Sequence, residues 1–229
     1  MTTVKDDKTI VREYFDATGF ERWKRIYGTD EVNKVQLDIR KGHQRTIETV
    51  VDWLQQDNNL QGLTICDAGC GVGSLAIPLA AAGAKVYATD ISAKMVSEAR
   101  QIAGSLGQAQ ENLSFDVKDL EELAGRFHTV ICLDVLIHYP ESKAHEMLTR
   151  LCSLAESRVI VSFAPKTPFY SSLKKIGSFF PGPSKATRAY LHREESVIQS
   201  LISNGMKIER VAMNKTRFYF SRTIEAKRG

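Results

Sequence analysis

The sequence has few of the features that stabilise secreted proteins or anchor membrane proteins. Its 229 residues include four cysteines, at positions 66, 70, 132 and 152, and none of them belongs to a Cys-x-x-Cys pair. Without a histidine-rich segment beside them, these cysteines argue against a disulfide framework or a metal site and favour a reducing compartment. No apolar run approaches the ~20 residues that cross a bilayer.

The N-terminus carries no recognisable targeting signal. Positions 5–8 are all charged, as Lys-Asp-Asp-Lys, and precede no apolar stretch, so a signal peptide is not expected. The segment is also not the arginine- and serine-rich, acid-poor type of a transit peptide. We therefore expect a cytoplasmic protein, at most peripheral at a membrane, with one large domain and no internal repeats.

The most informative segment is a short apolar strand that leads into a glycine-rich turn directly after an aspartate. Gly69, Gly71 and Gly73 permit positive φ and close approach of a ligand, and a helix is expected over 74–83 with its N-terminus at the same turn. Because a pyrophosphate disfavours a carboxylate here, Asp67 suits a cationic or hydroxyl-rich ligand. The pattern resembles motif I of the class I S-adenosylmethionine-dependent methyltransferases.

Two further strands end in acids that such a cofactor would need. The strand 85–89 ends in Asp90, about twenty residues past the glycines, where Rossmann-like folds hold ribose hydroxyls; capping the helix that starts near Ser92 is the alternative. In this class of methyltransferase, the acid after the third strand faces the adenine amino group, which implies Asp119, with Asp116 as its competitor. The other expected cofactor-binding positions are Ile91, Leu120, Leu133 and Asp134.

The order of predicted elements separates this class from NAD-dependent oxidoreductases, which also place glycines and an acid in this way but usually need a second domain. Strands are predicted at 63–67, 85–89, 113–117, 128–133 and 158–163. They alternate with helices, which implies a parallel sheet. Two last strands, 207–213 and 217–223, are expected to pair across a turn at Asn214-Lys215. The expected fold is α/β and Rossmann-like, with seven mostly parallel strands and an antiparallel last strand.

The two flanks of this core carry the expected additions. Residues 1–60 are predicted to form an N-terminal helical lid, and residues 61–229 the methyltransferase domain, with a cap insertion at 165–192 after strand five. Segment 164–229 holds 13 basic and 4 acidic residues. In the cap, lysines and one arginine alternate with aromatics and prolines, which favours a flat, apolar, anionic ligand, a membrane surface or a nucleic acid. A solvated loop folded onto the core is the alternative.

Five blocks, at 14–28, 132–140, 162–168, 179–190 and 216–222, carry a more specific similarity. With the glycine turn, they resemble the magnesium-protoporphyrin IX methyltransferases of chlorophyll and bacteriochlorophyll synthesis along nearly the whole chain. The resemblance implies methyl transfer from S-adenosyl-L-methionine, leaving S-adenosyl-L-homocysteine, to a propionate of magnesium-protoporphyrin IX, which forms the 13-monomethyl ester. Methylation of another small aromatic or quinone substrate is the alternative.

The same resemblance has consequences for metals and partners. The magnesium belongs to the substrate, so no protein-bound metal is expected. A magnesium-chelatase porphyrin-binding subunit is the implied partner, with peripheral association at photosynthetic membranes. A nucleic-acid methyltransferase would usually carry an Asn/Asp-Pro-Pro-Tyr turn where 134–137 has Asp-Val-Leu-Ile, so no nucleic-acid partner is expected. A non-catalytic scaffold would leave the complete cofactor motifs unexplained.

The reaction needs orientation more than a base, because a propionate with a pKa near that of Glu, about 4.3, is already ionised at neutral pH. His138, after the fourth strand, is the leading candidate to orient it, with capping of the next helix as the alternative. Tyr27 ends a helix that resembles the lid of related enzymes and is expected to approach the methyl donor, or else to be a half-buried helix end. The positions expected to bind substrate are Tyr139, Lys174, Lys175 and Arg188.

The remaining aromatic and histidine residues singled out in the sequence are not expected to take part in catalysis or binding. Trp23 and Phe20 lie about one helical turn apart and are expected to pack the core of the lid rather than to contact porphyrin. The four other histidines have no placement comparable to that of His138. They are His43, His128, His145 and His192.

Overall fold

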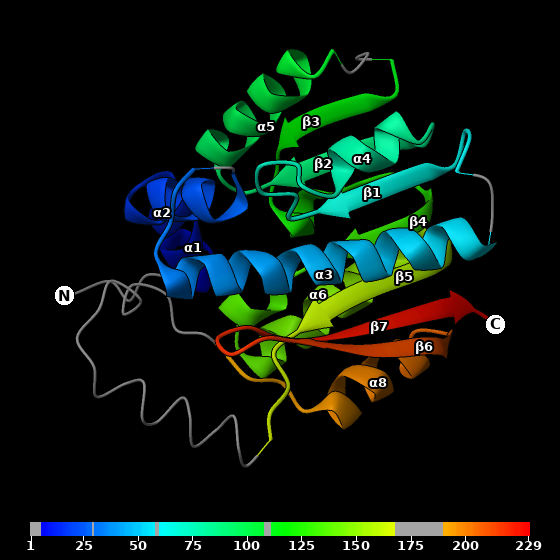
Figure 1. Cartoon of the computed structure of the whole chain (residues 1–229). Helices are drawn as coiled ribbons and strands as arrows, with labels where there is room; N and C mark the ends of the chain where they lie inside the picture. Colours follow the sequence, from blue (N-terminus) through cyan, green and yellow to red (C-terminus); the bar gives the residue numbers. More distant parts are fainter. Residues whose placement is uncertain (1–5, 29, 58–59, 108–110, 168–189) are drawn as a thin grey trace.

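The computed structural model describes residues 6–28, 30–57, 60–107, 111–167 and 190–229, and they form one seven-stranded sheet between helices (Figure 1). The strand order is β3-β2-β1-β4-β5-β7-β6. β7 is antiparallel to both of its neighbours, whereas the pairs among β1 to β5 are parallel. The strands are β1 Thr64–Ala68, β2 Lys85–Asp90, β3 Leu113–Val117, β4 Phe127–Cys132, β5 Ala155–Phe163, β6 Met206–Lys215 and β7 Phe220–Arg228. The predicted class I methyltransferase sheet is therefore confirmed.

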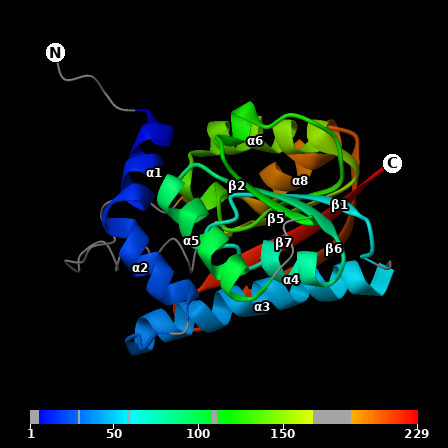
Figure 2. The same cartoon turned by 90° about the horizontal axis from the view of Figure 1, so that it is seen from above.

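The helices cover both faces of this sheet (Figure 2). They are α1 Asp7–Asp16, α2 Thr18–Tyr27, α3 Lys34–Asp57, α4 Ala76–Ala81, α5 Ala93–Ser105, α6 Glu141–Leu154 and α8 Glu194–Ser203, with short 3₁₀ turns η1 Leu120–Glu122 and η2 Leu136–His138. α3, α4 and α5 pack on one face, and α6 and α8 on the other. Because the order of strands reverses between β1 and β4, a crevice is expected at the carboxyl ends of these strands.

Two apolar layers hold the helices to the sheet. Val50 and Leu54 of α3 belong to the same buried cluster as Ile131 of β4, while the neighbouring Val130 belongs to the cluster that Leu148 of α6 completes on the opposite face. A strand buried on both faces needs consecutive apolar residues, as β4 has. Each fully buried side chain of this size contributes about 1.5–3 kcal/mol.

The last hairpin differs from the prediction at its turn. Asn214 and Lys215 were expected to form the turn, but β6 runs through both, and Lys215 pairs with Phe220 of β7. The turn is instead at 216–219, where the Asp38 carboxylate of α3 accepts hydrogen bonds from Thr216 Oγ1 at 2.6 Å and Phe218 N at 2.7 Å. A contact with a distant helix thus sets the position of the turn.

Most of the predicted cap insertion, 168–189, lies outside the described residues, and with it Lys174, Lys175 and Arg188. Its two flanks are placed side by side at the end of β5. Lys166 N donates to His192 O at 2.7 Å, and His192 N donates to Ala164 O at 2.9 Å. The insertion therefore leaves and rejoins the fold beside the carboxyl edge of the sheet.

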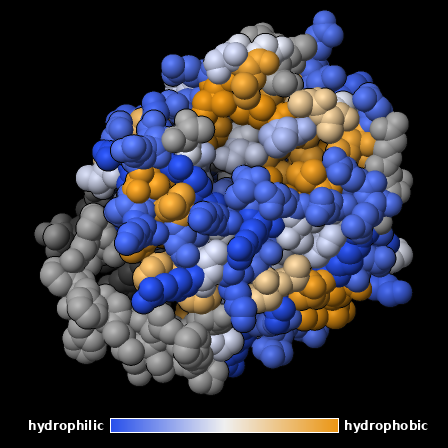
Figure 3. Space-filling view, in the orientation of Figure 1, coloured by the Kyte–Doolittle hydropathy of each residue, from blue (hydrophilic) through white to orange (hydrophobic). Residues whose placement is uncertain are grey.

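The surface over α3 is mostly hydrophilic, with apolar side chains gathered in separate patches (Figure 3). Within the described ranges, none of the helices combines the length and the apolar composition that a membrane span requires.

Candidate active site

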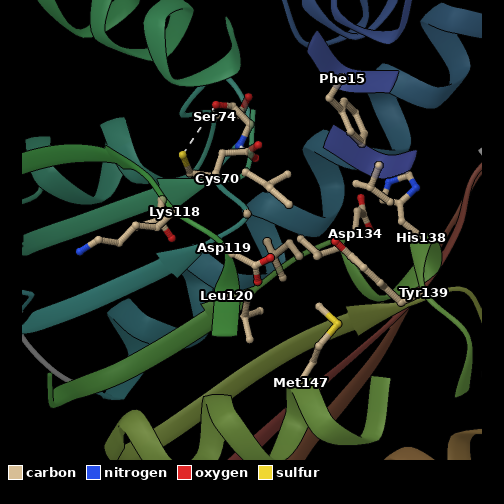
Figure 4. A pocket seen from close by; sticks show the side chains of 18 of the residues that line it. Phe15, Cys70, Ser74, Lys118, Asp119, Leu120, Asp134, His138, Tyr139 and Met147 are labelled. Atoms are coloured by element: carbon tan, nitrogen blue, oxygen red, sulfur yellow. Dashed lines mark hydrogen bonds between the residues drawn. The ribbon is translucent and has the colours of Figure 1, made fainter. Parts of the chain in front are cut away.

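A cavity opens at the carboxyl ends of β1, β2 and β4 and is closed by α1 and the end of α2 (Figure 4). Eight of the ten predicted cofactor-binding positions line it, namely Gly69, Gly71, Asp90, Ile91, Asp119, Leu120, Leu133 and Asp134. The other two, Asp67 and Gly73, are not among its lining residues. α1 adds Val11 and Phe15, so the N-terminal segment forms part of the same wall.

The glycine loop is fixed by backbone hydrogen bonds and, at Gly69, by packing that leaves no room for a side chain. Gly69 N and Cys70 N both donate to Thr89 O, at 2.7 and 2.9 Å. Gly69 has φ of +89°, and a Cβ there would lie 2.1 Å from Val135 Cγ2. At Gly71, with φ of +53°, a Cβ would meet only the Tyr27 ring at 3.8 Å, so the backbone of Gly71 is open to a ligand.

Asp90 is held at the edge of this loop. Its Oδ2 accepts from Gly71 N at 3.0 Å and its Oδ1 from Ser92 N at 2.9 Å. Burial raises the pKa of Asp90 to about 6, against the effect of these hydrogen bonds. Ser92, not Asp90, caps α5, because its hydroxyl accepts from Met95 N. The ribose-binding role of Asp90 in the cavity stays a prediction.

Asp67 is more deeply placed than the motif suggests. It is 2% exposed, and its Oδ2 has no hydrogen-bond partner in the described structure. Burial, with the nearby Asp90 charge, raises the pKa of Asp67 to about 7. Its direct contact with the cofactor remains a prediction.

The third strand end separates the two acids that competed there. Asp119 lines the cavity and caps η1, where it accepts from Glu121 N at 2.9 Å. Asp116 instead accepts from Tyr87 at 3.1 Å and pairs with Lys118 at 3.2 Å, with its side chain 44% exposed. This geometry favours Asp119 over Asp116 as the residue that meets a ligand.

A second cavity, of about 330 Å³, adjoins the first. The two share a wall of four residues: Tyr27, His43, Asp134 and His138. Apolar side chains dominate the rest of its lining, and they come from α2, α3, η2, the β6–β7 hairpin and the chain on either side of 168–189. Ligands in the two cavities would therefore contact the same four side chains.

His138 points into the shared wall from η2 (Figure 4). Burial lowers its pKa to about 4, although the Asp134 charge opposes this shift, so the ring is neutral at physiological pH. Its Nδ1 is buried without a partner among the described residues, and its ring packs edge-on against Phe15 at 5.1 Å. It does not cap α6, which has no side-chain cap. A neutral, unpaired nitrogen at this point is available to a ligand.

The aromatic candidates separate between the cavities. Tyr27 lies between the rings of Trp23 and His43, at centroid distances of 5.3 and 4.4 Å, and burial raises its pKa. Tyr139 lines the first cavity only, whereas Trp23, expected only to pack the lid, borders the second. Phe20 borders neither cavity.

Sequence reasoning missed His43 and the β6–β7 turn residues Arg217, Phe218 and Tyr219, all of which line the second cavity. The three turn residues were missed because the turn was predicted at Asn214-Lys215 instead of at 216–219. His43 lies inside a long helix, and its position along the chain carries no signal of what it faces. Among the described residues, no group of three His, Cys, Asp or Glu side chains could hold a metal ion.

Comparisons with known proteins agree on one family. Residues 132–228 match the family model "Magnesium-protoporphyrin IX methyltransferase C-terminus", and residues 65–157 match a general methyltransferase domain. The chain is 58% identical to magnesium-protoporphyrin O-methyltransferase of Synechocystis over 97% of each chain. It is also 58% identical to the chloroplastic magnesium protoporphyrin IX methyltransferase of Arabidopsis thaliana, over 96% of this chain and 71% of that one.

A solved structure shows the same fold at similar identity. The crystal structure of magnesium protoporphyrin IX methyltransferase from Synechocystis PCC 6803 with bound SAH superposes with a TM-score of 0.90 at 56% identity. The match covers 98% of this chain and all of that one.

Proposed function

This chain belongs to the magnesium-protoporphyrin IX methyltransferase family, and on that premise we propose that it transfers a methyl group from S-adenosylmethionine to a propionate carboxylate of magnesium-protoporphyrin IX. The observation that supports this most directly is the wall shared by two adjoining cavities. One cavity has the chemistry of the cofactor, and the other is apolar and wide. S-adenosylmethionine supplies the methyl group when bound.

The residues of the first cavity fit a cationic cofactor that carries a ribose. Asp90 offers carboxylate oxygens beside the open backbone of Gly71, and Asp119 lines the far end with Leu120. Asp90 and Asp67 together bring negative charge to a buried region, which is costly without a cation. We assign the ribose to Asp90 and the adenine to the Asp119 end.

We place the macrocycle in the second cavity. Its walls are apolar and include Trp23, Ile137, Phe218 and Phe220. Among the described residues that line it, the one basic side chain of the Lys or Arg type is Arg217. A flat apolar ring with carboxylates at one edge fits such a lining, with an edge directed at the shared wall. The predicted contacts of Tyr139, Lys174, Lys175 and Arg188 with substrate remain additional proposals.

The chain's own residues then have to orient a carboxylate and keep water away from it. Tyr27 and His138 lie on the shared wall, and both are half-buried. The neutral His138 can donate one hydrogen bond without a net positive charge that would hold back the attacking oxygen. Exclusion of water favours a reaction in which an anion and a cation neutralise each other.

The macrocycle is apolar and has to be delivered to this cavity. We therefore also propose a magnesium-chelatase porphyrin-binding subunit as the partner that hands it over, and peripheral contact with photosynthetic membranes.

Incubation with S-adenosylmethionine and magnesium-protoporphyrin IX tests the proposed function. We expect mass spectrometry to show a gain of one methyl group on the porphyrin. The dimethyl ester of the same porphyrin, which has no free carboxylate, is the matched control. An unchanged mass of the free acid, or methylation of the diester, would contradict the proposal.

Cofactor affinity should rise with pH between about 5.5 and 7.5. The pKa values of Asp90, about 6, and Asp67, about 7, are both raised by burial, so at low pH both carboxyls are protonated and cannot attract a cation. Calorimetry in buffers of different ionisation enthalpy should also show proton release on binding. The window ends near pH 7.5 because the cofactor's own α-amino group titrates at about 7.7–8.0.

Weak cofactor binding at low pH can be distinguished from unfolding by the direction in which Asp67 and Asp90 change the stability of the fold with pH. A carboxyl whose folded pKa is raised stabilises the fold below its unfolded pKa of about 3.9 and loses this contribution as pH rises through the folded value. Hence these two groups destabilise the free protein less at pH 5.5 than at pH 7.5, and weaker binding at pH 5.5 would not be a result of unfolding. Asp90→Asn should flatten the pH profile of affinity, and Asp116→Asn, the competing acid outside the cavity, should leave it unchanged. Equal profiles for all three proteins would exclude the role of Asp90.

A further inference from the structure

His43 of α3 has its ring in the wall between the two cavities, although nothing in the sequence marked it as functional. Its Nδ1 lies 2.9 Å from Asp134 Oδ2, and the ring packs against Tyr27 with centroids 4.4 Å apart. The side chain is 13% exposed. Asp134 occupies Nδ1 and Tyr27 covers one face of the ring, so the Nε2 edge remains for a ligand. The described part of the chain offers Nε2 no hydrogen-bond partner.

Asp134 is held as a charged acceptor behind this ring. Its Oδ2 also accepts from Tyr219 Oη at 2.7 Å, and its Oδ1 from Ser162 Oγ at 2.9 Å and Ser221 Oγ at 3.2 Å. Burial acts to raise the pKa of Asp134, but the hydrogen bonds from His43, Tyr219 and Ser162 hold it below its usual value. An ionised carboxylate can only accept, so the proton between the two residues belongs to Nδ1 of His43.

The backbone conformation of Asp134 shows that surrounding contacts hold this residue in place. Asp134 has φ of +57°. Within the described ranges, no other residue except glycines adopts a positive φ. Such a conformation is sparsely populated and persists where surrounding contacts enforce it. Here those contacts come from α3, β5 and β7 at once. The carboxylate is therefore fixed, and through Nδ1 it fixes the direction of the His43 ring.

We propose that His43 orients the acceptor carboxylate through Nε2 and that Asp134 acts through His43 as a positioning residue. This inference rests on the proposed function. When both ring nitrogens carry protons, the Asp134 charge balances that of His43, so Nε2–H is offered to the anion without a net positive charge. A carboxylate has two oxygens, and the two histidines of the shared wall can each donate to one of them.

This role requires no proton transfer. One carboxylate oxygen forms the new bond to the methyl carbon as the carbon–sulfur bond breaks, and that electron pair remains on sulfur. Because the propionate is already ionised, no proton is taken or released, and His43 keeps its protons through the reaction. Its contribution is to hold the attacking group in line.

Two amide substitutions separate orientation of substrate from a purely structural tether. In His43→Gln the side-chain amide reaches the place of Nε2, facing the second cavity, but loses the hydrogen bond to Asp134. In His43→Asn the amide reaches the place of Nδ1 and keeps the hydrogen bond to Asp134, but it offers no donor to the substrate. We expect His43→Asn to lower kcat/KM for the porphyrin by about 10- to 100-fold, as for a lost hydrogen bond to a charged group. His43→Gln should recover most of this loss. A tether predicts the reverse order.

Binding provides a readout that does not depend on turnover. Absorbance titration of magnesium-protoporphyrin IX, with S-adenosylhomocysteine present, should show weaker porphyrin binding by His43→Asn than by His43→Gln. Thr49→Val is the matched control, because Thr49 lies on the same helix, bonds to Asn214 Oδ1 at 3.2 Å outside the Asp134 network, and borders neither cavity. It should bind and react like the wild type.

Asp134→Asn tests the positioning role by spectroscopy. Asparagine tolerates positive φ, but without the charge the hydrogen bond from His43 Nδ1–H at this position should weaken, which a shifted Nδ1 signal in ¹⁵N NMR of the imidazole would show. An unchanged Nδ1 signal, or His43→Asn reacting as well as the wild type, would overturn this inference. If instead the wild type leaves magnesium-protoporphyrin IX unmethylated, the proposed function fails, and the NMR result still decides how Asp134 acts on His43.

Discussion

Replacement of Gly69 with alanine should abolish measurable cofactor binding and lower the free energy of unfolding by about 2–4 kcal/mol. The new Cβ would lie 2.1 Å from Val135 Cγ2, and the residue would need φ of +89°. Since Gly69 N anchors the loop to Thr89 O at 2.7 Å, any shift that relieves the clash also moves the loop that surrounds the ligand. Calorimetric titration and chemical unfolding measure the two effects.

A second glycine separates the clash from the cost of the backbone conformation. Gly107 has φ of +65°, and a Cβ added there would have no described atom within 4 Å. Gly107→Ala should therefore cost only about 1 kcal/mol for the left-handed conformation and bind cofactor normally. If Gly69→Ala and Gly107→Ala behave alike, the close approach of Val135 does not control the loop.

Replacement of His138 with alanine should lower kcat by about 100-fold, the loss expected when a reacting group is misplaced by about 1 Å. Cofactor affinity should change little, because the unpaired Nδ1 is proposed to face the acceptor carboxylate. His138→Asn, which keeps a donor, should recover part of the rate. Steady-state kinetics with each substrate varied in turn gives kcat and both KM values.

The control for this substitution is a histidine outside the site. His128 lies in β4, borders neither cavity and bonds to Thr129 Oγ1 at 2.9 Å. His128→Ala should therefore leave kcat unchanged while it removes a ring of the same size. Full activity of both His138 variants would show that His138 only packs against Phe15.

The cofactor half of the site could be predicted because it is local in sequence. Each strand of a parallel sheet delivers the residue after it to the same edge, so Asp90, Asp119 and Asp134 could be brought together from strand boundaries alone. The exceptions are Asp67 and Gly73, which do not line the cavity. Periodicity gives the strand to which a residue belongs, but it does not give the depth of that residue.

The acceptor half could not be predicted, because its residues are distant in sequence. His43 reaches Asp134 across 91 positions, and Tyr219 reaches it across 85. Neither residue has a spacing that distinguishes it, and the turn that presents Tyr219 is placed by Asp38 of α3 rather than by local turn chemistry.

The sequence alone determined the sheet, the glycine loop and the acids at the strand ends, because hydrophobic periodicity and the geometry of parallel strands act over a few residues. Only the tertiary structure decided which of those acids is buried, where the last hairpin turns, and that a helix histidine stands between the two cavities. The physical reason is that desolvation, pKa and a side chain's partner depend on packing between segments far apart in the chain.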